Sequence, residues 1–442
     1  MMLPIIPPPI LDDQLVLPIW KLTPKQQRFG RITEINETLL KAVMPWVSLG
    51  EICYIQPDNI PAEVISIHDE LVSLSPFTSA HGLKAGQWIC SSNSEYKIPL
   101  SNGLLGMVVD GLGRPFPNQK EIPFVDEYRS LYAPAPDPMS RALIDAPMPL
   151  GVKAIDSVLT CGIGQRIGIF ASAGGGKSTL LGMLCDGSQA DVIVLALVGE
   201  RGREVREFTE LVLSPEAKAK SVIVVSTSER PVLERLKASW TATTIAEYFR
   251  DKGLNVLLMV DSLTRYARAV REVGLAAGEP AVSGGFPPSL FAQLPRLLER
   301  AGPAKVGSIT AIYTVLVEGD NMNEPVADEV RSLLDGHIIL SRKLADRHHY
   351  PAIDVMSSVS RVMNMVTTKR HQLLAGKLRY LISLYREIEL LVRVGEYQKG
   401  QDLESDEALA RWPLIRDFLC QSTDERGDYE QTLQQLEQVI EG

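Results

Sequence analysis

The sequence predicts an α/β protein with a central parallel β-sheet covered by helices, an N-terminal small β-barrel and a C-terminal helical domain. Three observations predict this fold. From about residue 151, apolar runs alternate with helical segments, which is typical of β-α-β units. Short alternating runs separated by turn residues fill residues 28–95, as in a small barrel or sandwich. After about residue 365, apolar residues recur only at helical spacing.

Changes in composition and in the pattern of apolar residues divide the chain into four expected parts. These are a Pro-rich arm (1–25), the β-barrel domain (26–95), the central domain (96–365) and the helical domain (366–442). In the central domain we expect strands at 166–171, 191–199, 221–228, 255–262, 308–318 and 337–342, with helices at 229–252 and 289–301 among the connections.

Composition excludes several classes of protein. The 442 residues are 45% hydrophobic and carry a net charge of -9 with no long basic run, which argues against nucleic-acid binding. The five cysteines are scattered and form no CxxC pair, so we expect reduced, mostly buried thiols and neither a disulfide framework nor a zinc site. No apolar run reaches the roughly 18 residues of a membrane span, and the start lacks the basic segment of a signal peptide.

A glycine-rich loop follows the first strand of the central domain. The stretch ASAGGGKS (171–178) fits the phosphate-loop pattern, with alanine in place of the first glycine, and a helical segment follows it. Glycines let backbone N–H groups approach phosphates, and a helix N-terminus favours anions. Lys177 is suited to neutralise phosphate charge, and Ser178 to bind Mg²⁺. The predicted phosphate-binding residues are Gly174, Gly175, Gly176, Lys177, Ser178 and Thr179.

Two carboxylates end neighbouring predicted strands. Asp261 follows an apolar strand, as a Mg²⁺-binding Walker-B acid does, although it also suits a cap of the next helix. Glu200 ends another strand, where it would orient or deprotonate an attacking water. Arg201 and Glu204 follow, and Glu204 would join the outer Mg²⁺ shell, unless this charged run is only a solvated helix start.

Several motifs together resemble the rotary-type ATPase family, which has RecA-like cores and forms hexameric rings. They are the phosphate loop, VGER, LLMVDSLTRYARA and PAIDVMSSVSR, with further matching stretches over roughly residues 100–402. Within that family the sequence looks most like the type III secretion system ATPases, and next like the flagellar export ATPases. GGFPPS and the NEP…DEVR segment favour the secretion type.

The resemblance implies roles for individual residues. Glu200 would be the catalytic carboxylate with Arg201 beside it, and Asp261 would be the Walker-B acid. Arg361 would be an arginine finger that reaches the neighbouring subunit's γ-phosphate, and Tyr350 would stack on adenine. Without the resemblance, an ion pair suits Arg361 and a core position suits Tyr350. We interpret His348 and His349 as surface residues, because no third metal-ligand pattern accompanies them.

The resemblance also implies a function and partners. It predicts an ATP phosphohydrolase that uses ATP and Mg²⁺ as a homohexamer and energises protein export by chaperone release and substrate unfolding. Expected partners are a central stalk protein, stator or sorting-platform proteins and chaperone–effector complexes, with no nucleic acid. The expected location is cytoplasmic and peripheral at the inner-membrane export gate.

Four alternatives remain open on the sequence. A flagellar export ATPase shares most motifs, and a non-catalytic nucleotide-binding ring subunit shares the phosphate loop but would lack Glu200. A hexameric RNA translocase would need a basic, aromatic face on the barrel, which residues 28–95 do not show. An ATP synthase catalytic subunit is disfavoured by the length and the C-terminal sequence.

Overall fold

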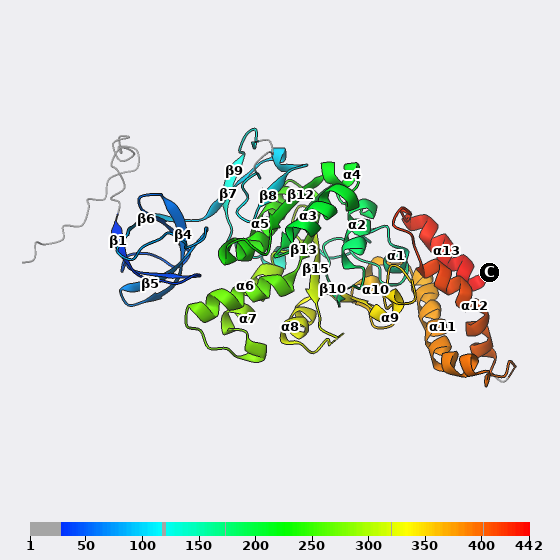
Figure 1. Ribbon diagram of the computed structural model, residues 1–442. Helices are drawn as coiled ribbons and strands as arrows, with labels where there is room; N and C mark the ends of the chain where they lie inside the picture. The colour runs from blue at the N-terminus through cyan, green and yellow to red at the C-terminus, as the bar shows by residue number, and fades with distance from the viewer. Residues whose placement is uncertain (1–27, 117–120, 173, 320, 401) are drawn as a thin grey trace, which may run out of the picture. The chain divides into compact units, whose positions relative to one another are not determined.

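The computed structural model describes residues 28–116, 121–172, 174–319, 321–400 and 402–442 (Figure 1). The predicted Pro-rich arm, residues 1–25, lies outside these ranges. The chain divides into two compact units, which meet in sequence between Glu95 and Tyr96. In the part of the chain that is described, no helix is long and apolar enough to cross a bilayer.

The first unit is a closed antiparallel barrel with the strand order β1-β2-β5-β4-β3-β6. Alternate residues point inward, so Ile32, Leu40, Val64, Leu74 and Ile89 meet in one apolar core. The predicted barrel is therefore confirmed. Its strands are β1 (Phe29–Ile35), β2 (Leu40–Val43), β3 (Glu51–Ile55), β4 (Ile60–His68), β5 (Leu71–Pro76) and β6 (Trp88–Glu95).

The second unit is built on one large sheet with the order β17-β16-β10-β15-β13-β11-β12-β8. Its strands are parallel except the edge strand β17 and the short β14, which pairs with β15. A separate ribbon joins β7 to β9. The strands are β7 (Lys97–Leu100), β8 (Val108–Asp110), β9 (Glu127–Ser130), β10 (Arg166–Ala171), β11 (Val192–Val198), β12 (Ser221–Ser226), β13 (Asn255–Asp261), β14 (Gly302–Pro303), β15 (Ser308–Leu316), β16 (Gly336–Leu340) and β17 (Val359–Ser360).

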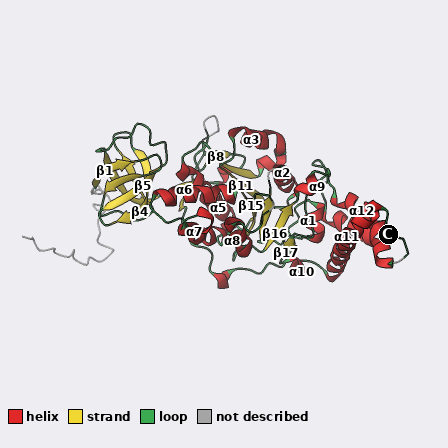
Figure 2. Cartoon of the chain, turned by 60° about the horizontal axis from the view of Figure 1, so that its bottom comes forward, coloured by secondary structure: helices red, strands yellow, loops and turns green. Residues whose placement is uncertain are grey.

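Helices cover this sheet, because strands buried on both sides need apolar partners on both (Figure 2). The helix α5 packs against β11, β12 and β13, whereas α2 shares a different core cluster with alternate residues of the same strands. The helices are α1 (Lys153–Val158), α2 (Lys177–Gly187), α3 (Gly202–Glu207), α4 (Pro215–Ala219), α5 (Val232–Asp251), α6 (Leu263–Ala276), α7 (Pro288–Leu298), α8 (Pro325–Leu333), α9 (Arg342–Ala345) and α10 (Met363–Val366).

Three further helices complete the chain: α11 (Lys369–Val394), α12 (Leu403–Leu419) and α13 (Tyr429–Glu441). Leu378, Ile415 and Leu436, one from each helix, belong to the same apolar cluster as α2 and the sheet. The C-terminal helices therefore share a continuous core with the central sheet. The domain boundary near residue 365 stays a prediction.

All six strands predicted for the central sheet are present, and both predicted helices lie within one to three residues of their observed bounds. The predicted strands overrun mainly at their C-terminal ends, for example at 221–228 and 308–318. There the apolar or β-branched run continues into the turns that follow the strands.

A buried arginine ties several segments to α5. Arg300 Nε donates to Glu247 Oε1 at 2.9 Å, and its terminal nitrogens donate to Thr244 Oγ1 and to the carbonyl of Leu131. Arg300 is fully buried and Glu247 is 2% exposed. The guanidinium also lies 5.7 Å from the centroid of the Trp240 ring. Because the two buried charges compensate each other, loss of one partner leaves an uncompensated buried charge.

We expect Arg300→Met to destabilise the second unit by about 3–5 kcal/mol, since Glu247 would remain buried without its cation. The double variant Arg300→Met with Glu247→Leu should recover part of that loss. The measurement is the midpoint of urea unfolding, followed by circular dichroism. Arg331→Met, at an exposed ion pair with Asp328, is the matched control and should shift the midpoint little. Equal midpoints for Arg300→Met and Arg331→Met would contradict the assignment.

Candidate active site

The candidate site lies at the carboxyl ends of four adjacent strands, β10, β15, β13 and β11. The phosphate loop follows β10, Asp261 is the last residue of β13, and Glu200 follows β11 after one glycine. In open parallel sheets, ligands bind at this edge, because the connecting loops converge there. Residues 177, 200 and 261, which are far apart in sequence, thereby come together.

Glycine is required in the phosphate loop by its backbone geometry. Gly174 and Gly176 have φ of 83° and 80°, in the left-handed region that side chains rarely adopt. Gly176 directly precedes α2, so the loop leads into a helix N-terminus. A Cβ at Gly176 would lie 3.5 Å from the Tyr350 ring, which places that aromatic side chain against the loop.

One ammonium group sits between two carboxylates. Lys177 Nζ donates to Asp261 Oδ1 and lies 3.7 Å from Glu200 Oε1. Asp261 and Glu200 are 4% and 8% exposed. Two buried carboxylates with one lysine leave an excess negative charge within this trio, which favours the approach of a further cation.

Thr314 holds Asp261 in place and was not predicted from the sequence. Thr314 is two residues before the carboxyl end of β15, the strand between those that carry the loop and Asp261, and its hydroxyl donates to Asp261 Oδ1 at 2.7 Å. The available signal was a hydroxyl residue inside the apolar run SITAIYTVL. That Thr314 would lie beside Asp261 depends on the order of the strands in the sheet, which could not be derived from the sequence.

Burial raises the pKa of Glu200, Lys177 opposes this shift, and Asp261 adds to it. Glu200 Oε1 is buried and accepts no hydrogen bond from the described residues. The same holds for Ser172 Oγ in the loop, and Arg265 Nε likewise donates none. Arg265, in the first turn of α6, was also missed, and its side chain packs against Gly199. Unpaired buried polar atoms at one edge of the sheet fit a site completed by a ligand.

The remaining predicted residues near the loop are more exposed. Ser178 and Thr179 lie exposed in the first turn of α2. Arg201 pairs with Glu204 at 3.5 Å, and both side chains are largely solvent-exposed. The alternative role of Asp261 as a helix cap is wrong, because Ser262 caps α6 by accepting from the Arg265 backbone N–H.

Tyr350 is 41% exposed, which excludes the alternative of a core aromatic. Its carbonyl accepts from the Gln421 backbone N–H at 2.9 Å, so the C-terminal helical segment borders this side of the loop. His348 is exposed as expected. His349 corrects the expectation of a surface residue: it is half-buried, with Nδ1 3.3 Å from Cys420 Sγ. The reason is that the segment around residue 350 packs against the end of α12.

Arg361 lies apart from the phosphate loop of its own chain. Its backbone N–H donates to Asp335, at the amino end of β16, whereas the loop is level with Leu340 at the carboxyl end. Five residues of strand separate these positions by about 16 Å. Arg361 is exposed, and no ion pair of its side chain is found among the described residues. A role for Arg361 in nucleotide chemistry therefore requires a second chain.

The fold and this site define a phosphate-loop nucleotide hydrolase. Residues 151–360 match the model of the ATP synthase alpha/beta family, nucleotide-binding domain. Residues 367–438 match the T3SS EscN ATPase C-terminal domain.

Relatives that match this chain over nearly its whole length identify the family within this class of nucleotide hydrolases. The SPI-2 type 3 secretion system ATPase of Salmonella typhimurium is 54% identical over 93% of this chain and 95% of that protein. The flagellum-specific ATP synthase of Bacillus subtilis is 45% identical over 96% and 98%. The assembled ATPase EscN of enteropathogenic E. coli, solved with its central stalk EscO, is 55% identical with a TM-score of 0.87 over 93% of this chain and all of that chain. The chain belongs to the type III secretion system ATPase family and is an ATPase, which confirms the predicted resemblance.

We expect Thr314→Val to lower the ATP turnover number by about tenfold, since a buried hydrogen bond to a carboxylate is lost while the side-chain shape is kept. Thr310→Val is the matched control. It removes a buried hydroxyl at the start of the same strand, where Thr310 Oγ1 accepts from the Gly164 N–H at 2.8 Å. Steady-state ATP hydrolysis of both purified variants checks this. An equal loss in Thr310→Val would mean that only folding is affected.

Proposed function

We propose that the chain is a Mg²⁺-dependent ATPase motor that works as a homohexamer and energises protein export by a type III secretion system. The observation that carries the proposal is the trio of Lys177, Glu200 and Asp261 at the phosphate loop, with Arg361 on a different edge of the same chain. Together with Mg²⁺, the trio would supply what phosphoryl transfer to water needs except an arginine, and Arg361 would supply that arginine only to a neighbour.

Nucleotide binding is assigned to the loop and its surroundings. Backbone N–H groups of Gly174, Gly175 and Gly176 and the start of α2 would face the phosphates, with Lys177 against the β- and γ-phosphates. Thr179 would donate a further hydrogen bond to phosphate. Because the Tyr350 ring borders Gly176 and is exposed, it is placed to stack on adenine.

The donor set fits a magnesium ion that is held together with the nucleotide. The described residues contain no group of three or more His, Cys, Asp or Glu side chains that would bind a metal without help, and Mg²⁺ commonly combines one or two protein ligands with substrate phosphates. Ser178 and Asp261 would hold it, with Glu204 in the outer shell. When bound, Mg²⁺ supplies neutralisation of phosphate charge.

Glu200 is assigned as the group that orients the attacking water and accepts its proton. Its Oε1 has an unused acceptor position beside Lys177, and burial keeps its pKa above the ordinary range for glutamate. A base with a raised pKa accepts a proton more readily at neutral pH. Arg201 follows Glu200 directly and is exposed in one chain. We assign it, with Glu200, to the catalytic residues at the carboxyl edge of the sheet.

A ring explains why Arg361 lies about five strand residues from its own loop. In a head-to-tail ring, one surface meets a different surface of the next subunit, so Arg361 of one chain can reach the γ-phosphate bound by another. The EscN relative is described as assembled and as bound to a central stalk. By analogy, we assign a stalk protein as partner of this chain, which the helical part, 366–442, would contact as hydrolysis proceeds round the ring.

Further assignments follow the secretion family. Turnover would release chaperones from effectors and unfold the substrate, and sorting-platform or stator proteins would hold the ring in the cytoplasm, peripherally at the inner-membrane export gate. No nucleic-acid partner is assigned. The flagellar alternative keeps support from the 45% identical relative, but the secretion ATPases of Salmonella typhimurium and Xanthomonas euvesicatoria are more similar, at 54% and 52% identity. Restoring secretion, rather than motility, in cells that lack their own ATPase distinguishes the two.

Glu200→Gln should retain ATP binding and lose at least a hundredfold in turnover, because glutamine cannot accept a proton. Binding is measured by isothermal titration calorimetry, and turnover by phosphate release. Glu207→Gln, an exposed α3 residue paired with Arg203 at 2.8 Å, is the control and should stay near wild type. Normal turnover in Glu200→Gln would refute the assigned role and favour another base.

Arg361→Ala should leave ATP affinity within about twofold and remove most turnover, since a transferred arginine can contribute several powers of ten in rate. Nucleotide affinity and turnover are measured on the same preparation, with the oligomeric state checked by light scattering. Arg342→Ala, another exposed arginine of this unit, is the control. Lost ATP affinity in Arg361→Ala would indicate a structural role instead.

A further inference from the structure

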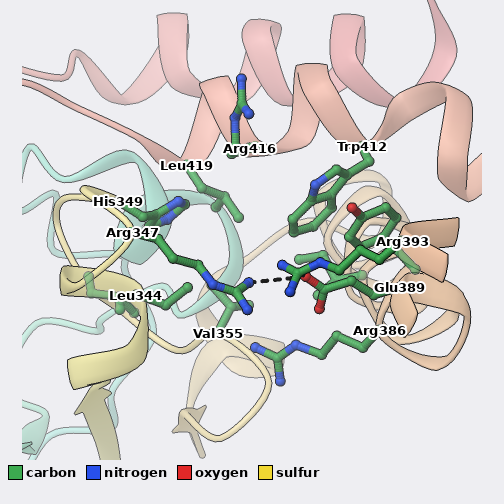
Figure 3. Close-up of a pocket in the computed structure, with 13 residues that line it drawn as sticks. Leu344, Arg347, His349, Val355, Arg386, Glu389, Arg393, Trp412, Arg416 and Leu419 are labelled. Carbon is green, nitrogen blue, oxygen red and sulfur yellow. Dashed lines mark hydrogen bonds and ion pairs between the residues drawn. The ribbon is translucent and has the colours of Figure 1, made fainter. Parts of the chain in front are cut away.

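A second cavity lies outside the nucleotide site. It has a volume of about 280 Å³, at the small end of pockets that hold small molecules, and it opens between segment 344–355 and the helices α11 and α12 (Figure 3). None of Lys177, Glu200, Asp261, Tyr350 or the phosphate-loop glycines lines it. The proposed ATPase mechanism therefore leaves this cavity without a role.

Two arginines from different segments converge on one glutamate in this cavity. Arg347 NH1 lies 3.1 Å from Glu389 Oε1, and Arg393 NH2 lies 2.5 Å from the same oxygen. Figure 3 shows the guanidinium groups of Arg347 and Arg393 both directed toward the Glu389 carboxylate. One carboxylate balances one of the two positive charges, so this group retains a net positive charge that attracts an anion.

The other titratable groups that face the cavity do not cancel this charge. Arg386 pairs with Asp354 at 2.7 Å, and Arg416 pairs with Asp417 at 3.0 Å, so each brings its own carboxylate. His349 has its pKa lowered by burial and by Arg416, and is therefore neutral near pH 7. The excess positive charge thus stays with Arg347 and Arg393.

The rest of the wall is flat and apolar. Tyr385 and Trp412 stack with ring centroids 4.0 Å apart and an interplanar angle of 9°, and aliphatic side chains such as Ile382 and Leu419 complete the lining. Figure 3 shows Trp412 and Leu419 on the side from which α12 closes the cavity. A planar unsaturated body suits such a wall better than a hydrated ion.

We propose that this cavity binds a small planar molecule that carries one anionic group, with the anion on the N–H groups of Arg347 and Arg393 that do not bind Glu389, and the ring system against the wall formed with Trp412. A carboxylate and a phosphate monoester offer the same anionic oxygens to two guanidinium groups. A molecule held there would tie segment 344–355, which also carries Tyr350, to α11 and α12. This site is independent of the proposed ATPase mechanism.

The test uses naphthoate and naphthyl phosphate as probes, with neutral naphthalenemethanol as the uncharged control that keeps the same ring system. Isothermal titration calorimetry of the full chain should show saturable binding of at least one anion, one molecule per chain, and at least tenfold weaker binding of the alcohol. The two anions separate the carboxylate source from the phosphate source. Binding should persist with saturating ADP, because the nucleotide site is separate.

Substitutions of Arg393 and Arg347 show where the probe binds, and Arg370 of α11 is the matched control for Arg393. Arg393→Gln should weaken binding of the anion at least tenfold, and Arg347→Gln is an independent variant on the opposite wall. Arg370→Gln, an equally exposed arginine of α11 that pairs with Glu437 and Glu441, should leave affinity within twofold. The proposal is overturned if neither anion binds, if the alcohol binds equally well, if ADP abolishes binding, or if Arg393→Gln and Arg347→Gln both bind like wild type.

Discussion

The shared position of Lys177 between Asp261 and Glu200 is the interaction on which the rest of the site depends. One ammonium group, on a side chain that is 12% exposed, meets two buried carboxylates, and Thr314 fixes the nearer one. Without a nucleotide, Lys177 is engaged by carboxylates. A bound phosphate would compete for the same ammonium group and leave Asp261 and Glu200 free to meet a cation and a water. The trio carries two negative charges and one positive charge. It is therefore suited to bind a phosphate at Lys177 and a cation at the carboxylates.

The sheet makes this trio possible by placing four consecutive strand ends side by side. Each strand delivers one group: β10 the loop, β15 the hydroxyl of Thr314, β13 Asp261 and β11 Glu200. The same sheet holds Arg361 at the opposite end of β16. Because the strands are buried and hydrogen-bonded on both sides, this separation is a fixed property of one chain, and the proposed role of Arg361 depends on it.

Much of the fold was predictable because its signals are local. An apolar strand such as 166–171 is recognisable from its own residues. The loop ASAGGGKS is recognisable from its glycines, which its backbone conformation requires. Asp261 and Glu200 were predicted because carboxylates at the carboxyl ends of buried strands are unusual. Thr314 and Arg265 were not, since their importance comes from strand order and from packing between α6 and Gly199. The half-buried state of His349 was missed for the same reason: its partner, Cys420, is 71 residues away in sequence.

The central claim is that the catalytic site is completed by a neighbouring chain, and the most direct measurement is specific ATPase activity against protein concentration with Mg²⁺. Oligomeric state is recorded by light scattering on the same samples. The account predicts that turnover per chain rises with concentration in step with assembly. Substantial activity that stays constant across a range where the protein is monomeric would show that the site is complete within one chain, and would contradict the assigned role of Arg361.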